Sequence, residues 1–121
     1  MKDKIIVVED NADIREIITL ILSAEDFEVF ESSPDTLQDD IKTIKPNLVI
    51  LDYLLSHPMS GADLCKLIKT KEEHRHLPII LISAIADIAQ ISKICEATAF
   101  IGKPFNIADF VKTVNDTLII C

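Results

Sequence analysis

Apolar residues in this chain form two alternating patterns, which are short unbroken runs and longer stretches with helical spacing. The unbroken runs are Ile5–Val8, Leu48–Leu51 and Leu77–Ile82, and such runs are typical of parallel strands that are buried on both faces. Two shorter apolar stretches, Phe27–Val29 and Ala99–Ile101, lie between turn residues. The pattern therefore predicts five strands.

Between these strands, apolar residues recur three or four positions apart, which predicts helices. Asn11 is a candidate cap for a helix over Ala12–Ala24, and Ser33 with Pro34 is typical of an N-cap followed by the first helical residue. The second helix is therefore expected to start at Pro34. The other expected helices are Gly61–Lys69, Asp87–Glu96 and a segment that Asn106 caps and that carries Ile107, Phe110, Val111, Val114 and Leu118.

Five strands that alternate with five helices predict an α/β domain with a parallel sheet covered on both faces. Right-handed crossovers favour the doubly wound order 2-1-3-4-5. With 121 residues, 49% of them hydrophobic, the chain has the size of one compact domain, so residues 1–121 are expected to form a single unit.

Charge and cysteine content exclude several classes of protein. A net charge of −8 argues against direct binding of nucleic acid, which needs clustered Lys and Arg. Three widely spaced cysteines fit neither a disulfide framework nor a zinc site. The N-terminus is too charged for a signal peptide, and the longest apolar stretch is too short to span a membrane. We therefore expect a cytoplasmic protein that contacts neither membrane nor nucleic acid.

Polar residues follow four of the expected strands. Glu9 and Asp10 follow the first strand, Asp52 the third, Ser83 the fourth, and Lys103 lies just after the fifth. The carboxyl ends of parallel strands meet at one edge of the sheet, where such folds bind their ligands. We therefore expect these five side chains to form one site.

The expected site has the composition of a phosphoryl-transfer centre. Crowded carboxylates repel one another, and a hard divalent cation such as Mg²⁺ relieves that repulsion. The Lys103 ammonium and the Ser83 hydroxyl can donate to phosphoryl oxygens, and Asp52 is the candidate nucleophile. Each residue also has a plainer interpretation, as a helix-terminal acid, a turn or helix cap or a surface cation, but their joint occurrence at the strand ends favours a site.

The same residues resemble a known family. The acidic pair in VVED, the aspartate in LVILDYLL, Ser83-Ala84 after an apolar strand and the segment FIGKPF are similar to receiver domains of bacterial two-component response regulators. The resemblance covers essentially the whole chain. It implies a flavodoxin-like fold and a phosphorelay partner, either a sensor histidine kinase or a histidine phosphotransfer protein, whereas the downstream effector stays unknown.

The resemblance also implies roles for individual residues. Asp52 would accept a phosphoryl group from a phosphohistidine. Mg²⁺ would be bound by Asp10, Asp52 and the main-chain carbonyl of Leu54, with Glu9 acting through water.

The other roles concern the phosphoryl group and the switch. Ser83 and Lys103 would contact the phosphoryl oxygens, Phe100 would be the switch aromatic, and the Lys103–Pro104 bond would be cis, as X-Pro bonds permit. Such a domain is not an enzyme in the usual sense, because at most it catalyses its own phosphorylation and dephosphorylation.

Three departures from the family pattern are visible. The loop from Asp52 to Gly61 is one residue longer than usual and contains His57, a candidate for modulating solvent access. The segment from Ser83 to Lys103 is about two residues shorter than is typical, and Glu96 replaces a common glycine. The fourth helix is therefore expected to be short or irregular.

Two other classes of function stay open on the sequence alone. A pseudo-receiver would act as a phosphorylation-independent docking module, which phosphoryl uptake at Asp52 would exclude. A phosphohydrolase with an aspartyl nucleophile would need a general acid after Asp52, where none is present. For any of the three, crowding of Glu9, Asp10 and Asp52 should raise the pKa of at least one carboxylate.

Overall fold

The computed structural model describes residues 2–84 and 88–119, and its centre is a parallel sheet of five strands. The sheet has the order β2-β1-β3-β4-β5, with all neighbouring pairs parallel. This confirms the predicted order. The strands are β1 (Lys4–Val8), β2 (Glu28–Glu31), β3 (Leu48–Asp52), β4 (Ile79–Ser83) and β5 (Ala99–Gly102).

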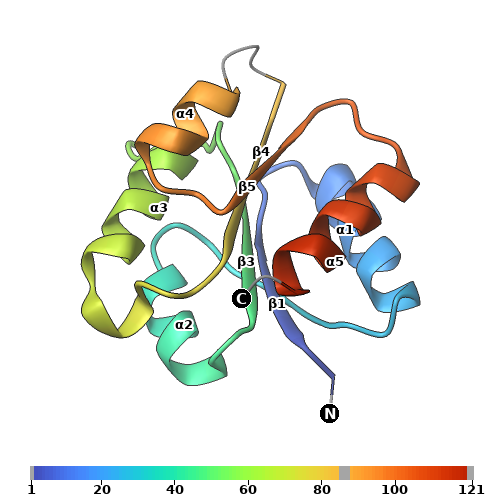
Figure 1. The fold of residues 1–121 in the computed structure, drawn as a ribbon, viewed down its shortest axis with the longest axis horizontal. Helices are drawn as coiled ribbons and strands as arrows, with labels where there is room; N and C mark the ends of the chain where they lie inside the picture. Colours follow the sequence, from blue (N-terminus) through green and yellow to red (C-terminus); the bar gives the residue numbers. More distant parts are fainter. Residues whose placement is uncertain (1, 85–87, 120–121) are drawn as a thin grey trace.

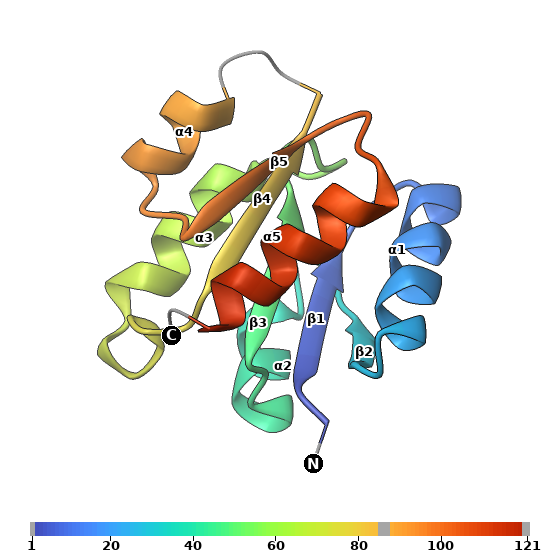
Figure 2. The same cartoon turned by 45° about the vertical axis from the view of Figure 1, so that its right-hand side comes forward.

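Helices cover both faces of the sheet, as Figure 1 shows. One face carries α1 (Ala12–Ala24) and α5 (Ile107–Ile119), which also lie side by side in Figure 2. The other face carries α2 (Leu37–Ile44), α3 (Gly61–Thr70) and α4 (Ile88–Ile94). A short 3-10 helix, η1 (Glu72–His74), precedes β4 and was not expected from the sequence.

The alternation of side chains along each strand explains why the inner strands are apolar throughout. In β1, Ile5 and Val7 pack in the cluster that contains α1 and α5, whereas Ile6 and Val8 pack in the cluster that contains α2, α3 and α4. All four are at most 1% exposed. Because each face needs its own apolar set, a parallel strand in the middle of the sheet cannot alternate with polar residues.

The second helix begins later than predicted, at Leu37 and not at Pro34. The residues before it form a turn, in which the Thr36 N–H donates to the carbonyl of Ser33 at 3.2 Å. The hydroxyls of Ser32 and Thr36 donate to the carboxylate of Asp40, at 2.6 and 3.0 Å. These hydroxyl groups hold a turn and do not cap the helix, so Pro34 is not its first residue.

The fourth helix has seven residues, which confirms the expectation that it is short. It was predicted over Asp87–Glu96, and Asp87 lies outside the described residues. The helix ends before Glu96, whose φ of 64° is left-handed, a conformation that favours glycine. A residue with a side chain therefore follows α4 in a conformation that glycine would adopt at lower cost.

Helices α3 and α4 meet at two buried cysteines. Cys65 of α3 is 0% exposed and Cys95, just after α4, is 2% exposed, and the Cys65 thiol donates to the Cys95 carbonyl at 3.3 Å. Burial, together with the neighbouring Cys95 thiol, raises the pKa of Cys65 well above its usual range. Cys65 therefore belongs to the hydrophobic core.

Within residues 2–84 and 88–119, no helix has the length and apolarity that crossing a membrane requires.

Candidate functional site

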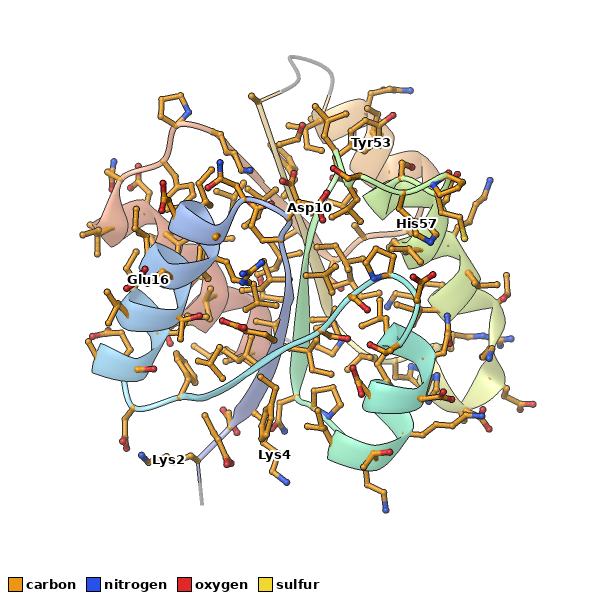
Figure 3. All side chains as sticks on the ribbon, turned by 180° about the vertical axis from the view of Figure 1, so that it is seen from behind. Lys2, Lys4, Asp10, Glu16, Tyr53 and His57 are labelled. Carbon is orange, nitrogen blue, oxygen red and sulfur yellow. The ribbon has the colours of Figure 1, made fainter. Side chains whose placement is uncertain are left out.

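The candidate site lies at the carboxyl ends of the strands, where β3 leads into the loop before α3. Figure 3 shows Asp10, Tyr53 and His57 at this end of the molecule, with Lys2 and Lys4 at the opposite end. The Gly61 N–H donates to the Tyr53 carbonyl at 2.9 Å. A Cβ at Gly61 would collide with the main-chain oxygen of Asp52. Glycine is therefore required for α3 to approach the end of β3 this closely.

Lys103 joins two buried carboxylates at this edge. Its Nζ lies 2.7 Å from Oε1 of Glu9 and 2.9 Å from Oδ2 of Asp52. The side chains of Glu9, Asp52 and Lys103 are 2%, 10% and 17% exposed, respectively. The two acids are buried because each extends an apolar strand, and the single cation offsets part of their charge.

The group has two acids, Glu9 and Asp52, and one cation, Lys103. This excess of acids affects the pKa of Glu9. Burial and the neighbouring Asp52 raise the pKa of Glu9 from 4.5 to about 7, although Lys103 acts in the opposite direction. Burial alone would lower the pKa of Lys103, but its hydrogen bonds to Glu9 and Asp52 outweigh burial and raise it. The expectation that at least one carboxylate of the group has a raised pKa is confirmed, with burial as the first cause.

Asp10 departs from the expected cluster. The residue is exposed, and its Oδ2 accepts a hydrogen bond from the Ser56 N–H in the loop after β3. Asp52 also accepts from this loop, through a bond of 3.3 Å from the Leu54 N–H to its Oδ1. The structure thus brings Glu9 and Asp52 onto Lys103, whereas Asp10 binds the loop.

Ser83 and Phe100 lie on the two strands beyond β3. Ser83 is 1% exposed, and its carbonyl accepts from the Lys103 N–H at 2.8 Å. Phe100 is 44% exposed on β5, opposite Leu81 in the register of the two strands. The Lys103–Pro104 bond is cis, as the resemblance implied. Ser83 therefore lies at the site edge, and Phe100 presents a large apolar side chain to solvent beside it.

The donor atoms at this edge suit Mg²⁺, which prefers carboxylate and carbonyl oxygens. Oε2 of Glu9 is buried, and in the structure as described it has no hydrogen-bond partner. A water bound to the cation would give this oxygen a donor. Among the described residues, no three His, Cys, Asp or Glu side chains are arranged around a common metal position.

Arg15 was not identified from the sequence, although it contacts the acidic pair. Its Nη1 donates to the main-chain carbonyl of Glu9 at 2.9 Å, and its Nε lies 3.5 Å from Oε1 of Glu31. This fixes the backbone between β1 and α1. Arg15 lies in the first turns of the expected helix, on a side that the isoleucine pattern leaves polar, and that position was the available signal.

A separate cavity lies at the amino end of the sheet. Its volume is about 640 Å³, and it is lined by residues that include Ile41, Lys42, Lys45, Glu73, His76 and Leu77. His74 also lines it. The cavity contains none of the predicted site residues, so it is distinct from the carboxyl edge.

Comparisons with known proteins agree with this geometry. The chain is 29% identical over 121 residues to the DNA-binding response regulator MtrA of Mycolicibacterium paratuberculosis, covering 98% of this chain and 52% of MtrA. It thus spans about half the length of that relative. It is 28% identical to the polar-differentiation response regulator DivK of Brucella ovis, where 98% of both chains is covered.

A solved structure shares the fold over its whole length. The receiver domain of NtrX from Brucella abortus superposes with a TM-score of 0.86 at 30% identity, covering 97% of this chain and 99% of that one. The family profile described as "Response regulator receiver domain" matches residues 5–115. The chain therefore belongs to the response regulator receiver domain family of two-component signalling.

Proposed function

We propose that Asp52 is the phosphoacceptor of a two-component phosphorelay. The observation that carries the proposal is the position of Asp52, a buried carboxylate at the end of a central strand whose Oδ2 lies 2.9 Å from the Lys103 ammonium. A buried carboxylate beside a fixed cation is arranged for charge that will move onto phosphoryl oxygens. Leu54 supplies a further N–H at the same side chain.

The reaction is a displacement at phosphorus. A carboxylate oxygen of Asp52 forms the new bond to phosphorus, while the bond from phosphorus to the nitrogen of the donor imidazole breaks. Lys103 is held by Glu9 as well as by Asp52, so its ammonium stays at the site and can bind the phosphoryl oxygens as negative charge moves there. Mg²⁺ bound by Asp10, Asp52 and the Leu54 carbonyl would supply further charge neutralisation.

The phosphoryl group then acts as a switch signal. Its oxygens would recruit the Ser83 hydroxyl, and Phe100 on the neighbouring strand would change its exposure as the surface of α4 and β5 rearranges. The phosphodonor would be a sensor histidine kinase or a histidine phosphotransfer protein of the cytoplasm. The name of MtrA describes a DNA-binding regulator, but that property belongs to the relative, and here the effector is not assigned.

The proposal is tested by intact-mass spectrometry after incubation with acetyl phosphate and Mg²⁺. Wild-type protein should gain one phosphoryl group, and Asp52→Asn should gain none. Asp3→Asn is the matched control at the amino end of the sheet, and it should behave as wild type. Phosphorylation of Asp52→Asn to the wild-type yield would reject Asp52, whereas an unmodified wild type would favour the docking-module interpretation.

A further inference from the structure

His57 links two loops at the site end of the molecule. Its side chain is 19% exposed, and its Nδ1 accepts a hydrogen bond from the Met59 N–H at 3.0 Å. Its Nε2 lies 3.0 Å from Oδ1 of Asp35, in the turn before α2. Because Nδ1 accepts in this geometry, Nε2 carries the proton and donates to Asp35. One imidazole thus fixes both its own loop and the turn beside it.

The loop that His57 fixes also supplies the main-chain groups of the site. Leu54 donates its N–H to Asp52, and Ser56 donates its N–H to Asp10. In the proposed function, the Leu54 carbonyl is also a ligand of Mg²⁺. The position of two or three site atoms therefore depends on how well residues 53–60 are held.

Asp10 and His57 are two of the side chains that bind this loop, and they respond differently to a cation. The bond from Ser56 to Asp10 occupies an oxygen of a carboxylate that the proposed function assigns to Mg²⁺. When Asp10 turns toward the cation, that bond weakens or breaks. The bonds of His57 to Met59 and Asp35 involve no proposed ligand, so binding of the cation does not require them to break.

We propose, on the basis of the proposed function, that His57 is a positioning residue that keeps the loop in place once Asp10 has moved to Mg²⁺. Without His57, the loop would be held by Asp10 in the metal-free state and would lose this anchor on binding. The entropy of ordering the loop would then oppose Mg²⁺ binding. The residue therefore acts on cation affinity and not on the chemical step.

Mg²⁺ titration followed by tyrosine fluorescence tests the inference, because Tyr53 is the one tyrosine of a chain that has no tryptophan and it adjoins Asp52. Replacing His57 with Ala should raise the Mg²⁺ concentration for half-saturation by about threefold to tenfold, the range expected for one or two lost hydrogen bonds. At saturating Mg²⁺, the rate of phosphorylation by acetyl phosphate should stay within about twofold of wild type.

Two conservative variants identify which bond matters. His57→Asn keeps an acceptor near Nδ1, whereas His57→Gln keeps a donor near Nε2. Rescue of Mg²⁺ affinity by Asn alone would assign the effect to the Met59 bond, and rescue by Gln alone to the Asp35 bond. Either rescue supports a positioning role. His76→Ala, at the other end of the sheet, is the matched control and should titrate as wild type.

Amide hydrogen exchange of residues 53–60 gives an independent readout. In Mg²⁺, the amides of this loop should exchange faster in His57→Ala than in wild type. In EDTA, where Asp10 still holds Ser56, this difference between the two proteins should be smaller. Equal Mg²⁺ half-saturation in His57→Ala and wild type would overturn the inference and leave the proposed function intact. If the wild type neither responds to Mg²⁺ nor gains a phosphoryl group, the proposed function itself fails, and this inference fails with it.

Discussion

The two ends of the sheet differ in their cavity and in their buried charge, and the candidate site is not at the end with the cavity. The amino end has a cavity of about 640 Å³ with Lys42, Lys45 and His76 in its lining. The carboxyl end instead has Lys103 in contact with two nearly buried acids, Glu9 and Asp52.

The difference shows that unbalanced charge is packed closely at the carboxyl end, outside the cavity. At the carboxyl end, burial shifts the pKa of Glu9 to about 7, and helix α3 approaches so closely that only glycine fits at position 61. A site with one cation between two buried acids is a functional candidate, because perturbed carboxyl groups concentrate where chemistry occurs. Matched substitutions at the two ends of the sheet test this difference.

The largest effect is expected for Lys103→Ala. At pH 8 in EDTA, the two buried acids lose the cation that lowers the pKa of Glu9. Either both acids are ionised and repel each other or Glu9 keeps its proton, and the free energy of unfolding should fall by about 2 to 3 kcal/mol. Mg²⁺ should restore more stability to this variant than it adds to wild type. Urea unfolding with and without Mg²⁺ measures both effects. Lys42→Ala, at the amino end, should change the free energy by less than about 0.5 kcal/mol, and equal losses would contradict the comparison.

A somewhat smaller loss is expected for Gly61→Ala. The added Cβ would meet the main-chain oxygen of Asp52, so α3 must move away from β3, at a cost of about 1 to 3 kcal/mol. At Gly102, a Cβ meets nothing within 4 Å, and Gly102→Ala should be nearly neutral. Thermal melting compares the two variants. If Gly61→Ala melts at the wild-type temperature, the close approach at position 61 does not determine the packing.

The smallest effect concerns pH. Folding raises the pKa of Glu9 from 4.5 to about 7, so the folded state binds its proton more tightly than the unfolded state. The penalty is absent below pH 4.5, grows as pH rises toward 7 and is complete above it.

Glu9→Gln removes this titration while keeping an oxygen acceptor for Lys103. Between pH 5 and 8 in EDTA, the wild type should therefore lose about 1 to 2 kcal/mol of unfolding free energy relative to the variant. Unfolding at a series of pH values gives the difference. Glu73→Gln at the amino end is the control, and its unfolding free energy should follow the wild-type curve against pH. If the Glu9→Gln curve instead runs parallel to the wild-type curve, burial of Glu9 has no energetic consequence.

The central strands and the strand-end residues could be predicted because a strand that is buried on both faces appears in the sequence as an unbroken apolar run. A strand such as β3 needs apolar side chains at each position, so the first charge, Asp52, marks its end. The parallel architecture then places Glu9, Asp52 and Lys103 at one edge, where the structure has them. The roles of these residues in phosphoryl transfer stay predictions.

Other features could not be predicted because several partners compete for one polar group. Asp10 could turn toward Asp52 or toward the loop, and only the path of the loop decides that it meets the Ser56 N–H. Similarly, Ser33 and Pro34 are typical of a helix start, but the carboxylate of Asp40 draws nearby hydroxyls into a turn and α2 starts at Leu37. Hydrophobic spacing contains no information about such choices.

The buried cysteine pair between α3 and α4 has a practical consequence for kinetics. Cys65 and Cys95 are at most 2% exposed, so an alkylating reagent reaches them only while the two helices are transiently apart. The rate of modification, read peptide by peptide in a mass spectrometer, therefore reports how often this part of the native state opens. Because the thiolate is the reactive form and burial raises the pKa of Cys65, rates must be compared at one pH. The natural thiols thus make the opening of α4 measurable without an introduced probe.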